Sequence, residues 1–149
     1  MWSELKRYRE ATSAQKHMLW EALVALALAR LAMACLPFRR IAAWLGTPGA
    51  ESPSTATPEE TRTAEAIGWA VGALGPRVPW DGRCLAQALA ATGMLRRRGM
   101  EGTVAIGARA GKAAGFEAHA WLRVGPKVVT GGDVYQSFQS FTTFARVRS

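Results

Sequence analysis

Cysteine and histidine are both scarce in this chain. Its 149 residues include two of each: Cys35, Cys84, His17 and His119. Residues so few and so far apart do not form the paired spacing of a structural zinc site. The sequence also lacks a glycine-rich phosphate loop and a paired-carboxylate motif, so it predicts neither a metal nor a cofactor. Without a disulfide pattern, the two cysteines are expected to be free thiols in a cytoplasmic protein.

Long apolar runs are absent as well. The most apolar segment, Met18 to Phe38, is interrupted by Glu21 and Arg30 and has no unbroken run longer than residues 22–29. A spanning helix needs roughly 18 apolar residues, so a membrane is not expected among the partners. The segment is predicted to pack against the domain or a partner, and a membrane-surface helix is the alternative. Residues 1–10 mix both charges, which excludes a signal peptide.

Acidic residues are outnumbered: 19 Lys and Arg face 11 Asp and Glu, for a net charge of +8. This balance suits nucleic acid, an acidic membrane surface or an acidic peptide. The cations are scattered, however, with small groups at residues 39–40 and 96–98, and no basic stripe carries interleaved aromatics. Nucleic acid is therefore not expected as a partner, and residues 96–98 suit the carboxyl end of a helix.

The chain is predicted to be α+β. Alanine- and leucine-rich periodicity, capping signals and glycine or proline stops predict four helices, over residues 13–35, 38–45, 58–74 and 82–98. In the fourth, Asp81 is the expected N-cap. Alternating patterns then predict strands over residues 103–109, 117–124 and 128–133, with a short helix or closing strand at 135–147. Helices followed by a small antiparallel sheet define this class.

Three parts are expected along the chain. Residues 1–46 read as an N-terminal helical arm, because alanine and leucine dominate them. Residues 47–57 are rich in Pro, Ser and Thr and lack large apolar residues, which is typical of a linker. Residues 58–149 form the expected main body.

Cys84 is the better-placed cysteine. The first turn of a helix presents unpaired backbone N–H groups and a positive dipole end, which favour the nucleophilic thiolate over the thiol. The same N–H groups suit an oxyanion. A small apolar residue packed under the sheet is the alternative, and Cys84 alone leaves both interpretations open.

His119 lies in the middle of a predicted strand. Alternation places it on one face with Glu117, Trp121 and Arg123. A lone strand histidine is more often structural, but a Cys–His pair oriented by a third group would be catalytic. Asp133 fits that third place if the loop at residues 125–127 has three residues, because His119 then faces it across the hairpin. A two-residue loop would instead place Asp133 on the opposite face of the sheet from His119.

Aromatic and charged residues near this pair are candidates for substrate contacts. Trp80 and Trp121 are candidates for the walls of a groove, and Glu117 for its rim. Core packing is the more common role of a buried tryptophan.

The sequence resembles the transglutaminase-like cysteine peptidases, and among them the lasso-peptide leader peptidases, the peptidase half of the lasso-peptide B protein. The resemblance rests on Cys84-Leu85, the segment from Leu95 to Gly99, Ile106-Gly107 and His119-Ala120-Trp121, and extends over nearly the whole chain. It implies a papain-like core, with a Cys-bearing helix packed on a small antiparallel sheet, and a Cys84, His119 and Asp133 triad.

The resemblance also implies a reaction and partners. The enzyme would remove the leader from a ribosomally made precursor peptide so that a lasso cyclase can close the core peptide. Because the chain begins directly with the helical arm, a separate leader-recognition protein is expected. A transglutaminase or other acyltransferase with the same triad, and a catalytically silent peptide-binding module, are the alternatives.

Overall fold

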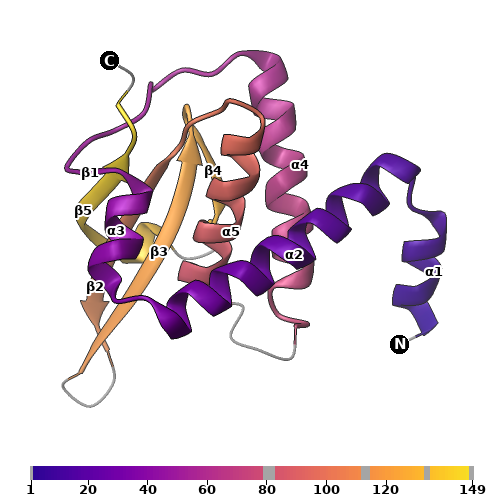
Figure 1. The fold of residues 1–149 in the computed structure, drawn as a ribbon, viewed down its shortest axis with the longest axis horizontal. Coiled ribbons are helices and arrows are strands. Elements are labelled where there is room, and N and C mark those ends of the chain that lie inside the picture. The colour runs from indigo at the N-terminus through magenta and orange to yellow at the C-terminus, as the bar shows by residue number, and fades with distance from the viewer. Residues whose placement is uncertain (1, 79–82, 112–114, 133–134, 148–149) are drawn as a thin grey trace.

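The structure, a computed structural model, describes residues 2–78, 83–111, 115–132 and 135–147. The chain is α+β, as predicted: a layer of helices lies against one antiparallel sheet (Figure 1). The α-helices are α1 (Trp2–Glu10), α2 (Ser13–Cys35), α3 (Phe38–Leu45), α4 (Pro58–Leu74) and α5 (Cys84–Arg97). The strands are β1 (Thr47–Pro48), β2 (Thr103–Ala110), β3 (Phe116–Val124), β4 (Lys127–Thr130) and β5 (Gln139–Ala145), with a 3-10 turn, η2, at Tyr135–Ser137.

Local capping explains where α4 begins. The Thr57 hydroxyl accepts a hydrogen bond from the backbone N–H of Glu60, and the Glu60 carboxylate accepts one from the N–H of Thr57. Pro58 occupies the first turn, where its missing N–H costs nothing. The predicted capping box is confirmed.

The beginning of α5 differs from the prediction. Arg83, with extended backbone angles, is the N-cap, so the expectation that Asp81 caps this helix was wrong. Asp81 itself lies outside the described residues. Because helical geometry begins only after Arg83, Cys84 is the first residue of α5 and lies in its first turn, as expected.

The sheet has the order β1-β5-β2-β3-β4, and all its neighbours are antiparallel. Part of the segment expected to be a linker belongs to it, since Thr47 and Pro48 pair with β5. Ser52 is also buried, and its N–H donates a 2.8 Å hydrogen bond to the Thr103 hydroxyl. The tail combines both predicted alternatives, because a single 3-10 turn precedes the strand β5.

The hairpin between β3 and β4 has a different turn from the one expected. Val124 pairs with Lys127, which leaves a two-residue loop of Gly125 and Pro126. The three-residue loop was therefore wrong. A register shift between Leu122 and Arg123 then brings Leu122 opposite Thr130, which is the pairing that the longer loop would have produced. The irregularity adds back the residue that the shorter loop omits.

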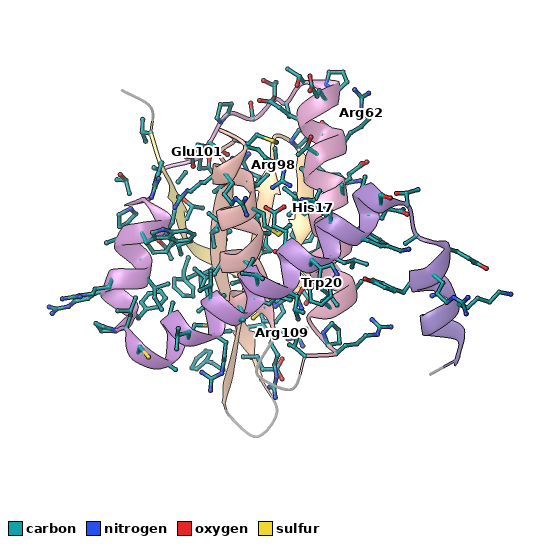
Figure 2. The ribbon with its side chains drawn as sticks, turned by 45° about the vertical axis from the view of Figure 1, so that its right-hand side comes forward. His17, Trp20, Arg62, Arg98, Glu101 and Arg109 are labelled. Carbon is teal, nitrogen blue, oxygen red and sulfur yellow. The ribbon has the colours of Figure 1, made fainter. Side chains whose placement is uncertain are left out.

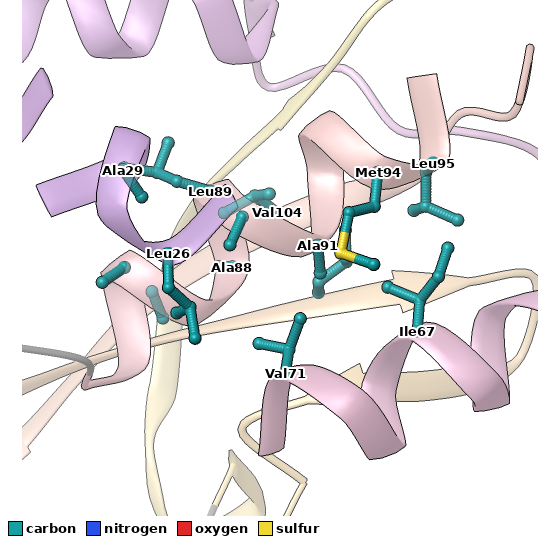
Figure 3. Packing of buried hydrophobic residues seen from close by; sticks show 14 of the residues in the cluster. Leu26, Ala29, Ile67, Val71, Ala88, Leu89, Ala91, Met94, Leu95 and Val104 are labelled. Atoms are coloured by element: carbon teal, nitrogen blue, oxygen red, sulfur yellow. The ribbon is translucent and has the colours of Figure 1, made fainter. Parts of the chain in front are cut away.

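The core lies between α5 and the sheet. Leu89, Met94 and Leu95 of α5 join Leu122 of β3 and Val104 of β2 in one buried cluster. Helices α2 and α4 flank α5 and contribute further buried side chains, including Leu26 and Val71 (Figure 3). Small residues such as Ala88 and Ala91 let these elements approach closely.

An ion pair fastens α2 to the carboxyl end of α5. Two Arg98 nitrogens donate to the two Glu21 carboxylate oxygens at 2.8 and 2.7 Å, and Figure 2 shows Arg98 close to α2. The Glu21 side chain is only 11% exposed. The hydrogen bond from Arg98 is the main reason that the pKa of Glu21 is lowered from its usual value.

Glu21→Gln is expected to reduce the free energy of unfolding at neutral pH by about 1–2 kcal/mol, because it removes a charged, two-pronged hydrogen bond. A lowered folded-state pKa stabilises the fold above the ordinary glutamate pKa of 4.5 and loses this effect as the pH falls through the lowered value. Denaturant unfolding at several pH values measures the difference, which should vanish in acid. Glu10→Gln, at an exposed position on α1, is the control. An equal loss of stability in both variants would contradict a specific contribution from the Glu21–Arg98 ion pair.

Candidate active site

Cys84 begins α5 and is half-buried. Its side chain packs against the core on the helix-covered face of the sheet. The first turn of α5 holds no acidic residue, so within this turn no carboxylate opposes the positive end of the helix dipole. Unpaired N–H groups at such a position stabilise a developing oxyanion.

His119 is held in a defined orientation on β3. Its Nε2 lies 3.1 Å from the backbone oxygen of Gly131. A carbonyl oxygen only accepts, so Nε2 is assigned as the nitrogen that bears hydrogen, and its N–H donates a hydrogen bond to the Gly131 oxygen. The lone pair is then on Nδ1, which is the nitrogen able to accept a thiol proton.

Aromatic rings enclose the imidazole on the outer face of the sheet. The His119 ring stacks on Phe138, with centroids 4.9 Å apart, and on Trp121 at 6.0 Å. Trp121 is buried and also meets Tyr135 at 6.0 Å. Sequence reasoning missed Phe138 and Tyr135, because which tail residues return over His119 depends on the pairing of β5 with β2.

Gly131 is required at its position for two reasons. Its φ is +72°, and an added Cβ would lie 2.9 Å from His119 Nε2 and 2.8 Å from the Ala120 oxygen. The left-handed backbone brings the carbonyl to the ring, and the missing side chain leaves room for it. Neighbouring glycines in a strand region, here Gly131 and Gly132, are a sequence signal for a close backbone approach or a bulge.

Cys84 and His119 lie on different faces of the sheet but at the same end of it. Ala120, Leu122 and Val124 are on the face that α5 covers, so His119 is on the other, as the predicted alternation had it. The amino end of α5 is at the same end of the sheet as the first half of β3 (Figure 1). β4 ends at Thr130, opposite Leu122, so within the described residues this half of β3 forms the sheet edge.

The edge is therefore the route by which the two side chains can approach each other. Cys84 and His119 are both described, and no hydrogen bond joins them. Catalytic hydrogen bonds are often long without substrate and shorten when it binds. The pairing of Cys84 with His119 remains a prediction.

The other predicted site residues differ in what the structure says of them. Asp133 and Trp80 lie outside the described residues. Trp121 contacts His119 directly through its ring. Glu117 is exposed and forms a 2.7 Å ion pair with Arg109 on β2, whose guanidinium also lies 4.5 Å from the Phe138 ring centroid. Glu117 therefore lies at the margin of the aromatic cluster.

The site thus combines a helix that begins with cysteine and an antiparallel sheet that carries an oriented histidine. Residues 21–143 match the transglutaminase-like superfamily, and the chain belongs to it. This superfamily usually comprises cysteine peptidases or acyltransferases. Comparisons with curated proteins and with solved structures returned no match.

Gly131→Ala is expected to displace the His119 ring, because the new methyl group would meet Nε2 and the backbone would be strained by about 1 kcal/mol. The imidazole resonances in NMR spectra should shift, with a small decrease in melting temperature. Gly132→Ala is the matched control, since an added Cβ there is 3.6 Å from the nearest atom, a Val128 methyl. Unchanged imidazole resonances in Gly131→Ala would contradict the assigned hydrogen bond.

Proposed function

We propose that the protein is a cysteine endopeptidase that removes the leader from a lasso-peptide precursor. The observation that carries the proposal is the His119 ring, whose Nε2 is occupied by the Gly131 carbonyl so that Nδ1 remains as a base. It occurs in a chain of the transglutaminase-like superfamily whose central helix begins with cysteine. The motifs His119-Ala120-Trp121 and Cys84-Leu85 support the narrower assignment to leader peptidases.

The reaction follows from these groups. His119 Nδ1 takes the Cys84 proton as Sγ attacks the scissile carbonyl, and the N–H groups at the start of α5 stabilise the oxyanion. The imidazolium then protonates the leaving amine, and water hydrolyses the thioester. Asp133 is proposed to stabilise the imidazolium beside the Gly131 carbonyl, and Trp80, Trp121 and Glu117 to contact the substrate.

Partners follow from the same proposal. The substrate is the precursor peptide, recognised through its leader by a separate leader-recognition protein. A lasso cyclase then uses the amine that cleavage exposes. No cofactor is required, because acyl transfer to a thiol and hydrolysis of the thioester need only the base and the oxyanion donors.

Cys84→Ala is expected to abolish leader cleavage without changing the melting temperature, because it removes the nucleophile and little core volume. Incubation with a precursor peptide encoded nearby, followed by mass spectrometry, measures cleavage. Cys35→Ala, which alters the exposed cysteine of α2, is the control and should cleave normally. Residual cleavage by Cys84→Ala would refute the assignment.

The same spectra distinguish the acyltransferase that the superfamily also allows. Hydrolysis adds water across one peptide bond, whereas acyl transfer yields a cross-link or an amide conversion.

Omission of the leader-recognition protein is expected to reduce cleavage at low micromolar precursor concentration, because the peptidase would then bind the leader poorly. Progress curves with and without that protein measure the effect. Identical rates in both would contradict an obligatory partner while leaving the peptidase assignment intact.

A further inference from the structure

Helix α2 carries an unusual amount of exposed apolar surface. Trp20, Val24, Leu28 and Leu31 are each 56–60% exposed. Within the described residues, α2 is the one helix that is long enough and apolar enough to cross a membrane. Only 17% of its most apolar 18-residue stretch is buried. A helix that is apolar on all sides is normally covered. The opposite side of α2 packs on α4 and α5, so its outer side is the part that needs a partner.

A groove lies beside this exposed ridge. It has a volume of about 390 Å³ and is lined by residues of α2, α3 and α5. Its small lining residues include Ala25, Ala29, Ala90 and Gly93, and its large ones include Leu28 and Trp44. Small residues in such a groove let the backbone of another helix approach closely, and the larger residues pack against its apolar side chains.

The rim of the groove is positively charged. Glu21, the acidic residue of its lining, is already bound by Arg98 and lies 3.4 Å from Arg97. Arg40 and Arg97 also line the groove, and Arg40 forms no ion pair with any residue in the described ranges. The rim therefore complements carboxylates. A second copy of this chain is a poor occupant, since each copy carries a net charge of +8.

We propose that this groove binds an amphipathic helix of a partner protein, with leucine-like side chains on the groove floor and carboxylates beside Arg40 and Arg97. Concavity favours a helix over a flat membrane surface. The inference does not depend on the proposed activity, because the groove and the predicted catalytic residues have no lining residue in common.

A designed peptide tests the proposal directly. The probe is a leucine- and glutamate-containing peptide of about 15–20 residues, with leucines at helical spacing, and its binding to the intact protein is measured by titration calorimetry. A peptide of the same composition without an apolar face, and one with lysine in place of glutamate, should each bind at least about tenfold more weakly, a difference of about 1.4 kcal/mol. Equal affinity for all three would overturn the proposal.

Two substitutions on α2 distinguish binding in the groove from nonspecific binding to the exposed apolar side of the helix. Leu28 and Leu31 are 60% and 59% exposed, but Leu28 lines the groove and Leu31 does not. Leu28→Glu should weaken binding about tenfold or more, and Leu31→Glu less than about twofold. Flotation with anionic phosphatidylglycerol vesicles gives the contrary outcome: vesicle binding that both variants lose equally would assign the surface to a membrane and overturn the proposal.

A charge substitution completes the test. Arg40→Glu should weaken binding of the glutamate peptide and strengthen binding of the lysine peptide. Arg62→Glu, at an exposed position on α4 (Figure 2) that does not line the groove, should change neither. Unchanged melting temperatures confirm that the variants are folded. Equal effects of Arg40→Glu and Arg62→Glu would reduce the interaction to net charge alone and contradict a built site.

Discussion

The packing of α5 against the sheet is the contact on which the fold and the site both depend. Ala88 and Ala91 let the helix lie close to β3, and Leu89 and Leu95 fill the space beside it. Thr92 is buried in this helix and satisfies its hydroxyl by donating to the Ala88 carbonyl at 2.7 Å. Because the helix cannot slide without opening this core, the position of its first residue, Cys84, is set by packing far from the thiol.

The two faces of the sheet have different roles. The inner face is apolar and holds α5 in place. The outer face holds His119 among Trp121 and Phe138, with Gly131 at its ring nitrogen. A thiol on one face of the sheet can transfer its proton to a base on the other face only at an edge of the sheet. In the described residues, the end of β4 at Thr130 provides that edge. The shortness of β4 therefore bears directly on the proposed pairing of Cys84 with His119.

The helical layer is also divided. Its inner side joins the core, while the outer side of α2 leaves large apolar side chains beside a cationic groove. The Glu21–Arg98 pair connects the two, because it fixes α2 on α5 while neutralising the acidic side chain of the groove. Catalytic chemistry and partner recognition would therefore occupy separate surfaces of one small fold.

The sequence by itself determined the helices α2 to α5, the capping box at Thr57 and the faces of β3, because periodicity and capping are local properties, whereas α1 was not predicted. It also singled out Cys84 and His119 as candidates. Only the tertiary structure decided the two-residue turn, the irregularity that compensates for it, and the aromatic residues around His119. These features depend on which distant backbone groups pair. A one-residue change in a turn moves every later side chain of the strand to the other face of the sheet, and a bulge can restore the original faces without any strong local signal in the sequence.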